Sequence, residues 1–274
     1  MLHFYDCNMN QKLIYEPNLK WRIFLKDTWY KILAKITKLP NIGTNNQSVR
    51  DFWLKDTLTN ISPGSRILDA GAGELKYKPY CEHLIYTSQD FCQYDGQGDG
   101  IGLQTCKWDQ NQIDIISDIS QIPRPDESFD AVMCIEVLEH VPNPVDAIRE
   151  LTRLLRENGS LIITAPFCAL THYAPFFYQT GYSRYFYEYW LEKFGYEILD
   201  MQWNGNFFTF LAQELHRLES IIQKSTDDQL SLIERFAIKL ILKALERFSE
   251  SDSGSNQLLS FGIHVHAVKK INKI

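Results

Sequence analysis

Glycines and carboxylates follow two short apolar runs near the middle of the chain, a combination that suits nucleotide-like ligands. The run from Arg66 to Asp69 is followed at once by Gly71 and Gly73, and the apolar run 84–89 is followed by Asp90. Glycines after a strand let backbone amides approach a ligand closely, and an acid after the next strand can accept both hydroxyls of a ribose. By itself this pattern predicts a site for many cofactors.

The spacing of the glycines and the nearby charges narrow the choice of cofactor. A dinucleotide fingerprint requires a third glycine at position 76, where this chain has Lys76, and the Walker pattern of a phosphate-binding loop is absent. Asp69 and Glu74 flank the turn, so the local field opposes a pyrophosphate and favours a cationic ligand such as S-adenosylmethionine. An oxidoreductase that binds NAD is therefore disfavoured.

Histidines and tyrosines after two later apolar runs could serve as acid–base groups. His140 follows the run 129–135, and His172 lies with Tyr178 in a loop after 161–164. Histidine can take a proton near neutral pH, and clustered tyrosines can form a stacking wall for a ring or a sugar. His140 could instead pack against and cap the next helix, and the tyrosines could be partly core, so these alternatives stay open.

Alternating strand and helix patterns must position these groups. Strands are expected at 66–69, 84–89, 113–116, 129–135, 161–164, 196–203 and 261–268. Helices are expected at 18–39, 48–59, 143–156, 183–194, 207–223 and 227–248, with Ser48 and Asn143 as capping residues, Asn158 and Gly159 as a stop, and a loop at 95–102. This alternation predicts an α/β fold with a doubly wound, mostly parallel seven-stranded sheet.

Several ordered motifs resemble those of the class I S-adenosylmethionine-dependent methyltransferases. They are ILDAGAG at 67–73, the acid Asp90, the pair Asp118 and Ile119, FDAVMCIEVLEHVP at 129–142, RELTRLLRENG at 149–159 and LIITAP at 161–166. The resemblance covers about residues 48–203, with 261–268 as the usual last strand. It implies a Rossmann-like methyltransferase fold, S-adenosylmethionine as the methyl donor and S-adenosylhomocysteine as the product.

The resemblance also implies a role for individual residues. The methionine portion of the cofactor would lie in a cradle formed by Asp69, Ala70, Gly71, Ala72 and Gly73. The ribose would be held by Asp90, and the adenine would lie against Phe91, with its amine and ring in contact with Asp118 and Ile119. Two further residues, Ile135 and Glu136, would lie beside the cofactor. One departure is Leu75, where the family often has a third glycine. Asp69 and Asp118 could instead be a turn cap and a loop acid, and Phe91 could be core.

The acceptor could be activated in two ways, by acid–base side chains without a metal or by a bound metal ion. Methyl transfer from a sulfonium needs alignment and the exclusion of water, and a base only when the acceptor is protonated. The expected catalytic residues are His140, His172 and Tyr178, with no metal ligand assigned. Glu136, Glu139 and His140 also form E-x-x-E-H, which is similar to metal-dependent small-RNA 2′-O-methyltransferases and ubiquinone-pathway O-methyltransferases, and His172 could supply a fourth ligand.

Composition limits the class of protein and its partners. The 274 residues are 45% hydrophobic and carry a net charge of −6, which excludes a disordered chain and disfavours a nucleic-acid binder. Residues 1–40 are locally basic, and the helix expected at 18–39 has a lysine-rich face that could cover the site as a lid or touch an anionic membrane, although ordinary packing on the core is favoured. No apolar run of 18 residues, no signal peptide and six scattered cysteines predict a cytoplasmic protein with reduced thiols.

These observations predict a methyltransferase with two parts. Residues 1–60 form an N-terminal helical extension or lid, and residues 61–274 form the methyltransferase domain with a helical, substrate-side insertion at 207–250. The expected reaction moves a methyl group to oxygen or nitrogen of a small-molecule acceptor, with a sugar, glycan or natural product as a weak preference. The alternatives are a metal-assisted O-methyltransferase and a non-catalytic protein that binds S-adenosylmethionine. The oligomeric state is not predicted.

Overall fold

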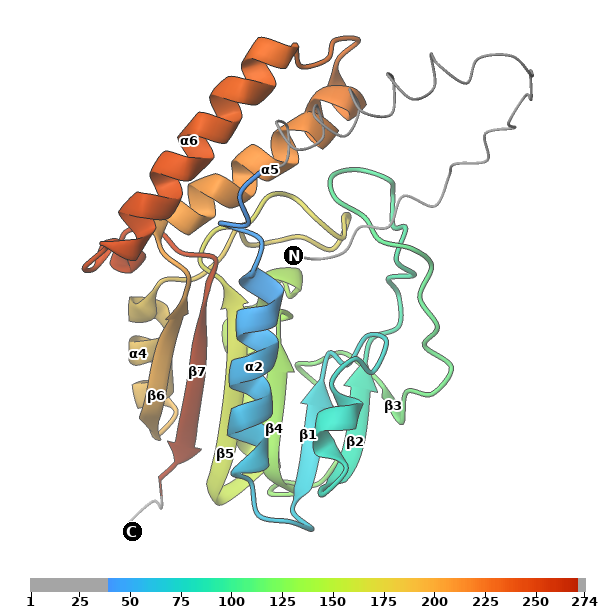
Figure 1. Ribbon diagram of the computed structural model, residues 1–274. Coiled ribbons are helices and arrows are strands. Elements are labelled where there is room, and N and C mark those ends of the chain that lie inside the picture. Colours follow the sequence, from blue (N-terminus) through green and yellow to red (C-terminus); the bar gives the residue numbers. More distant parts are fainter. Residues whose placement is uncertain (1–38, 271–274) are drawn as a thin grey trace, which may run out of the picture.

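A seven-stranded sheet organises the chain (Figure 1), and the computed structural model describes residues 39–270. The strands are β1 (Arg66–Ala70), β2 (Ile85–Asp90), β3 (Ile115–Ile116), β4 (Phe129–Ile135), β5 (Leu155–Pro166), β6 (Tyr196–Asn204) and β7 (Gly262–Lys269). Their order across the sheet is β3-β2-β1-β4-β5-β7-β6, and β7 pairs antiparallel with both β5 and β6 while the other pairs are parallel. The predicted mostly parallel, seven-stranded sheet is confirmed.

Helices cover both faces of this sheet. They are α2 (Asn46–Thr59), α3 (Pro144–Leu154), α4 (Arg184–Lys193), α5 (Phe207–Ser225) and α6 (Leu232–Glu250), with short 3-10 turns η1 (Lys78–Cys81), η2 (Leu138–His140) and η3 (Ser255–Gln257). Alternate residues of β4 point to opposite faces. Ala131 and Met133 join the core beneath α2, whereas Val132 and Cys134 join the core beneath α3 and α4. Because β4 is buried on both faces, its sequence is a nearly continuous apolar run.

Three helix ends differ from the sequence-based expectation. Helix α2 begins at Asn46, so Ser48 lies inside it and donates to the carbonyl of Asn45 instead of capping the helix. Asn143 precedes Pro144 as expected, but its side chain makes no capping hydrogen bond. Helix α6 begins only at Leu232, after a Ser231 capping box.

The predicted boundary between α3 and the fifth strand was also wrong. The helix ends at Leu154, and β5 begins at Leu155, which is fully buried and pairs with Phe129 at the start of β4. The predicted stop at Asn158 and Gly159 therefore lies inside the strand, with Asn158 at φ +58°. Sheet pairing overrides the local stop signal, because burying Leu155 against β4 removes apolar surface from water. Strand β3 is also shorter than expected, at two residues.

Helices α5 and α6 form a hairpin between β6 and β7, where the helical insertion was predicted (Figure 1). Their shared core contains Ala212, Ile238 and Leu242, and it extends to Leu39 and Ile42 at the start of the described chain. Figure 1 shows this hairpin beyond the carboxyl ends of the parallel strands, the edge at which open α/β sheets bind ligands. Apart from Leu39, the helix expected at 18–39 lies outside the described residues.

Two further expectations concern the membrane and the cysteines. From residue 39 to residue 270, no helix combines the length and the apolar character needed to cross a membrane. Cys81, Cys92, Cys134 and Cys168 form no disulfide within residues 39–270, and Cys7 lies outside the described residues, so the reduced state of the thiols stays a prediction.

Candidate functional site

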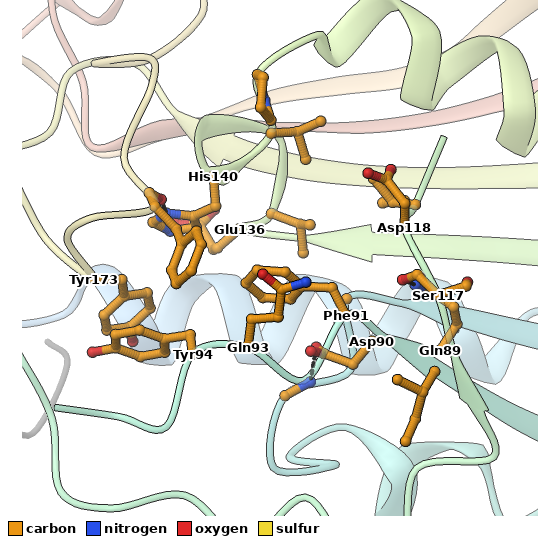
Figure 2. Close-up of a pocket in the computed structure, with 18 of the residues that line it drawn as sticks. Gln89, Asp90, Phe91, Gln93, Tyr94, Ser117, Asp118, Glu136, His140 and Tyr173 are labelled. Atoms are coloured by element: carbon orange, nitrogen blue, oxygen red, sulfur yellow. Dashed lines mark hydrogen bonds between the residues drawn. The ribbon is translucent and has the colours of Figure 1, made fainter. Parts of the chain in front are cut away.

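A cavity of about 410 Å³ opens at the carboxyl ends of β1, β2 and β4, where the strand order reverses (Figure 2). This is the edge at which open α/β sheets bind ligands, and the volume lies within the range of small-molecule sites. The predicted site residues that line it are Gly71, Gly73, Asp90, Phe91, Asp118, Ile119, Glu136, His140 and Tyr178. Asp69, Ala70, Ala72 and Ile135 do not line it, and His172 lines a smaller neighbouring cavity.

The turn after β1 brings backbone to the floor of this cavity. Gly71 has φ +80°, and a Cβ there would lie 2.5 Å from the side chain of Val137. Gly73 has φ +54°, and its amide donates to Asp90 Oδ2 at 2.9 Å. Leu75, at the position where the family often has a third glycine, is also left-handed at φ +59°. The turn thus keeps its left-handed shape at Leu75 despite the Cβ strain of about 1–2 kcal/mol.

Asp90 is the carboxylate that the turn holds in place. Its Oδ2 accepts the amide of Gly73, and its Oδ1 accepts the amide of Cys92 at 2.8 Å and the side chain of Gln110 at 3.3 Å. Burial raises the pKa of Asp90, and the amides of Cys92 and Gly73 partly offset this. Each carboxylate oxygen can accept more than one hydrogen bond, so Asp90 can also receive ligand hydroxyls.

Asp69 lies one layer deeper than the cavity wall. The residue is 2% exposed, and its carboxylate accepts a hydrogen bond from the Tyr86 hydroxyl at 2.6 Å. Burial raises the pKa of Asp69 to about 7, and the tyrosine hydrogen bond opposes that rise. Near neutral pH this carboxyl is therefore divided between its charged and neutral forms, and a nearby cation would favour the charged form.

Asp118 and Ile119 follow the short strand β3 at the same edge. Asp118 Oδ1 accepts from both the amide and the hydroxyl of Ser120, at 2.8 and 2.7 Å. The residue is therefore a loop-capping acid as well as part of the cavity wall, and Ile119 is buried beside it.

An aromatic wall, which the sequence did not assign to the cofactor site, closes one side of the cavity. It is formed by Tyr94, Trp108, Tyr173 and Phe176, with Phe91 in edge-to-face contact with Phe176 at 5.0 Å between ring centroids. The ring centroid of Tyr94 lies 4.9 Å from that of Trp108 and 4.8 Å from that of Tyr173. The rings come from two loops far apart in sequence, so no local spacing could have grouped them.

Glu136 stands at the end of β4 with φ +57°, a left-handed conformation that is uncommon for a residue with a side chain. Its Oε1 accepts the hydroxyl of Thr164 at 2.8 Å, and its Oε2 lies 2.8 Å from Nη1 of Arg50 on α2. Glu136 lines both cavities. Arg50 was missed from the sequence, where it is one basic residue in a helix, because only the folded chain brings α2 to the end of β4.

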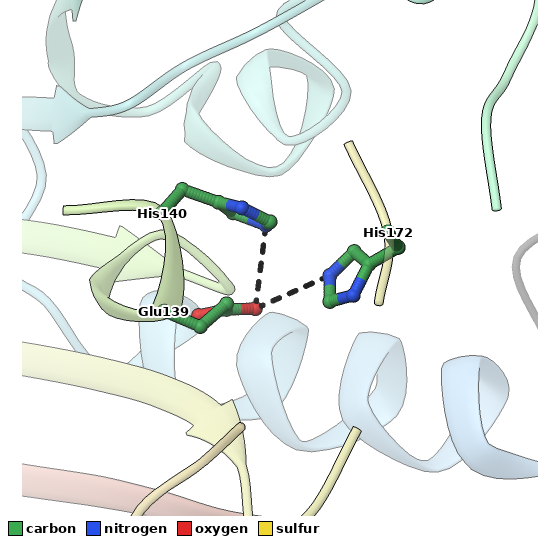
Figure 3. Close-up of side chains that lie close together, drawn as sticks. All are labelled: Glu139, His140 and His172. Carbon is green, nitrogen blue, oxygen red and sulfur yellow. Dashed lines mark ion pairs between the residues drawn. The ribbon is translucent and has the colours of Figure 1, made fainter. Parts of the chain in front are cut away.

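Glu139, His140 and His172 lie close together (Figure 3). Glu139 and His172 are buried, and His140 is half-buried and lines the large cavity. Glu139 Oε1 lies 3.7 Å from His140 Nε2 and 3.8 Å from His172 Nε2, and one ligand atom from each residue lies within 4.8 Å of the others. Nδ1 of His140 lies 2.6 Å from the carbonyl of Phe176, and Nδ1 of His172 lies 2.8 Å from that of Leu170. A carbonyl only accepts, so each Nδ1 carries the proton and donates it.

The protonation of this cluster follows from its burial. Burial and the neighbouring His172 lower the pKa of His140 to about 3, so His140 is neutral and its Nε2 carries a lone pair. Burial raises the pKa of Glu139, which is 0% exposed, and the nearby His172 partly offsets this rise. Burial alone would lower the pKa of His172, but Glu139 raises it above its usual value. The cluster therefore contains one neutral imidazole, His140, with a lone pair on Nε2, and one imidazole, His172, whose pKa is raised by Glu139.

Comparisons with known proteins identify the domain that carries this site. Residues 68–163 match the sequence family described as a methyltransferase domain. The chain is 53% identical over 38 residues to a ubiquinone biosynthesis O-methyltransferase of Glaesserella parasuis serovar 5, which is 14% of this chain and 16% of that protein. It is 54% identical over 37 residues to the enzyme of the same name from Xanthomonas oryzae pv. oryzae, again 14% and 16%. The matches thus span about one sixth of these relatives.

Solved structures give weaker likenesses. An S-adenosylmethionine-dependent methyltransferase of Archaeoglobus fulgidus aligns over 88% of this chain and 99% of its own, at 13% identity and a TM-score of 0.49. A phosphoethanolamine N-methyltransferase 2 of Haemonchus contortus, in complex with S-adenosylmethionine, aligns over 81% of this chain and 52% of its own, at 14% identity and a TM-score of 0.46.

The sheet, the strand-end residues and the matched domain define the class of protein. The chain contains a class I S-adenosylmethionine-dependent methyltransferase domain, and S-adenosylmethionine is the cofactor of that domain.

Proposed function

We propose that this protein transfers the methyl group of S-adenosylmethionine to oxygen or nitrogen of a small-molecule acceptor. The observation that carries the proposal is the cavity at the strand-order reversal, which is lined by Asp90, the glycines of the turn after β1 and His140. Asp90 would accept the ribose hydroxyls. Gly71 supports this fit, because a Cβ at that position would meet Val137 and only glycine leaves the turn its shape.

The chain's own groups would align the reactants and exclude water. When bound, the cofactor supplies a methyl group already activated by a sulfonium, so the protein has little covalent chemistry to perform. The aromatic wall of Tyr94, Trp108, Tyr173 and Phe176 would shield the reaction from water. His140 Nε2, which is neutral and has no hydrogen-bond partner among residues 39–270, would accept the proton of an acceptor hydroxyl or ammonium.

His172 and Tyr178 complete the proposed catalytic set. His172 would tune His140 across the ring contact of 4.7 Å between their centroids. Tyr178 lines the cavity and is 47% exposed, which suits a group at the entrance that contacts the acceptor. The predicted cofactor residues that do not line the cavity, Asp69 among them, would support the residues that do.

Calorimetric titration with S-adenosylhomocysteine, run beside NAD, tests the cofactor assignment. We expect micromolar binding of S-adenosylhomocysteine, none of NAD, and a loss of at least about tenfold in affinity in Asp90→Ala, since charged hydrogen bonds contribute about 1.5–3 kcal/mol. Asp95→Ala is the matched control, because Asp95 accepts from backbone amides of its own loop. Stronger binding of NAD, or equal affinity in the two variants, would refute the proposal.

A metal-assisted O-methyltransferase is a second candidate, favoured by one observation. Both carboxylate oxygens of Glu139 are buried and have no hydrogen-bond donor within the described part of the chain, an expensive state for a charge. The Nε2 atoms of His140 and His172 lie near the Glu139 carboxylate. Each histidine donates a hydrogen bond from its other ring nitrogen to a backbone carbonyl, as metal-bound histidines do. A divalent ion held there would lower the pKa of an acceptor hydroxyl.

The arrangement of these side chains favours three ligands over the four proposed from the sequence. Glu139, His140 and His172 converge, whereas both oxygens of Glu136 are engaged by Thr164 and Arg50. Thermal unfolding with Mn²⁺ or Co²⁺ tests this candidate: an ion at 100 times its Kd would add about 2.7 kcal/mol of stability. Glu139→Gln should abolish the gain, and Glu219→Gln, which changes an ion pair between α5 and α6, should keep it. The absence of any gain in the unmutated protein would dismiss the metal.

The division of the chain stays a prediction. Helix α2, within the proposed N-terminal extension 1–60, packs on the sheet, where Trp53 Nε1 donates to Asp200 of β6 at 2.9 Å. We propose that the lid function belongs to the part of the extension before α2. Loss of activity on removal of residues 1–38, with S-adenosylhomocysteine binding retained, would support that role.

A further inference from the structure

A second, smaller cavity lies beside the proposed reaction centre. It measures about 60 Å³ and lies between the start of α2, the middle of α5 and the loop that follows β5. Glu136 belongs to the walls of both cavities, while His172 lines the small cavity and His140 the large one. A group bound in the small cavity would therefore lie against Glu136 and His172, next to the proposed reaction centre.

Two arginines line this small cavity. Arg50 is 6% exposed, and its Nε has no hydrogen-bond partner among the described residues although its Nη1 meets Glu136. Arg217 of α5 lies 2.6 Å from Glu214, and burial lowers its pKa, an effect that Glu214 partly offsets. An arginine has five N–H donors in a planar fork, so one carboxylate partner leaves donors available.

The neutral polar groups of the wall are already engaged with one another. Asn46 donates to Gln213 Oε1 at 3.0 Å, and Gln213 donates to Glu214 at 3.1 Å. Asn46 also accepts twice from the side chain of Asn204, through its carbonyl at 2.9 Å and its Oδ1 at 2.8 Å. The guanidinium groups are consequently the strongest donors that remain for a ligand, while Glu136 is the acidic group that such a ligand must tolerate.

We propose that this cavity is an acceptor subsite that binds an anionic group, a carboxylate, phosphate or sulfate, through Arg50 and Arg217. The inference deepens and rests on the proposed methyl transfer, because it names the class of acceptor: a small molecule that carries an anionic group beside its nucleophile. A volume of about 60 Å³ admits a compact polar group and excludes a ring. The rest of the acceptor then extends past Glu136 and His172, toward the cofactor cavity.

Protection of a cysteine tests the subsite without any acceptor. Cys168 is exposed and lines the same cavity, so an anion bound there should slow its alkylation by N-ethylmaleimide. With sulfate at 10 times its Kd, about ten sites are occupied for each free one. We therefore expect the rate of alkylation of Cys168 to fall at least several-fold relative to the rate in chloride at equal ionic strength. Peptide mapping by mass spectrometry reads each cysteine separately, and Cys92, beside Asp90, serves as the internal control.

Matched arginine variants complete this experiment. Arg217→Gln should remove the protection, whereas Arg235→Gln, which changes an ion pair between α6 and α5 outside the cavity, should keep it. Arg217→Lys keeps the charge and should retain part of the effect. Equal alkylation of Cys168 in sulfate and chloride, or protection that survives in Arg217→Gln, would overturn the anion subsite.

Pairs of acceptors that differ in one anionic group then test whether the subsite contributes to turnover. They also distinguish a carboxylate from a phosphate as the bound anion. The pairs are 3,4-dihydroxybenzoate with catechol for a carboxylate, and glucose 6-phosphate with glucose for a phosphate. We expect the anionic member of one pair to be methylated with a kcat/KM at least about tenfold higher, and Arg217→Gln to remove this preference mainly through KM. Equal rates within both pairs would refute the inference. Sulfate protection with no methylation of any compound would instead count against the proposed function and leave the anion site standing.

Discussion

The charge of Asp69 should make cofactor affinity depend on pH. Burial raises the pKa of this carboxyl to about 7 in the unliganded protein. A cofactor that places its ammonium or sulfonium nearby favours the ionised form, so binding releases the proton that Asp69 holds below that pH. For a pKa near 7, the ionised fraction rises from about one tenth at pH 6 to about nine tenths at pH 8, and the affinity for S-adenosylhomocysteine should rise about tenfold.

Asp69→Asn is the variant that isolates this effect. Calorimetric titrations of both proteins at pH 6, 7 and 8 give a ratio of dissociation constants in which the titration of the cofactor itself cancels. We expect this ratio to change about tenfold, by about 1.4 kcal/mol, in favour of the unmutated protein as the pH rises. A constant ratio would refute the reasoning, because any remaining pH dependence would then come from groups that both proteins share, such as Asp90, whose pKa burial also raises.

The same carboxyl should affect stability with the opposite sign. Its pKa is higher in the folded state than the ordinary 3.8, so between about pH 4 and 7 the folded protein binds a proton that the unfolded chain has lost. Stability from this group is present at low pH and is lost as the pH rises through about 7, at about 1.4 kcal/mol per unit. Urea unfolding without cofactor should therefore show the unmutated protein gaining stability relative to Asp69→Asn as the pH falls from 7 to 5.

Three further predictions concern single side chains. Tyr86→Phe removes the donor to the buried carboxylate and should lower the free energy of unfolding at pH 8 by about 1–3 kcal/mol, and by less at pH 5, in urea unfolding. Leu242→Ala, at a fully buried position, should cost about 2–5 kcal/mol, whereas Ile233→Ala, at 82% exposure, should change stability by less than about 0.5 kcal/mol; equal effects would show that the hairpin core is misassigned. Gly71→Ala should abolish binding of S-adenosylhomocysteine, because its Cβ would meet a side chain at 2.5 Å. Gly64→Ala has a similar φ of +78° and open space around it, so it should cost only about 1–2 kcal/mol of stability; a loss of calorimetric binding in both would point to general misfolding.

The sequence predicted the sheet well because its strands carry strong local signals. The nearly continuous apolar run of β4 marks burial on both faces, and the glycine turn after β1 marks the ligand edge. Helix ends were predicted less well, since Ser48 and Asn158 are ordinary local signals that tertiary pairing overrides. Strand β3 was overestimated because only two of its residues reach β2.

Part of the candidate site was also accessible from local pattern. Asp90 is the last residue of β2 and Gly73 lies in the turn after β1, and the resemblance of these motifs to a known family assigned both residues to the cofactor site. His140 and His172 were singled out separately as possible bases, and the fold brings their rings to 4.7 Å. Their shared burial with Glu139, which sets the charge of both, could not be inferred from spacing.

The order of the elements and the chemistry at each strand end therefore follow from the sequence, because periodicity, glycines and adjacent acids act over a few residues. Which distant groups meet depends on the packed chain: Arg50 of α2 contacts Glu136 after β4, Arg217 of α5 lies beside the same cavity, and Trp108 meets Tyr173 in the aromatic wall. Desolvation and Coulomb interactions depend on distance through space and not along the chain. Burial turns an ordinary Asp69 or His140 into a group with a displaced pKa, and only the packed fold creates that burial.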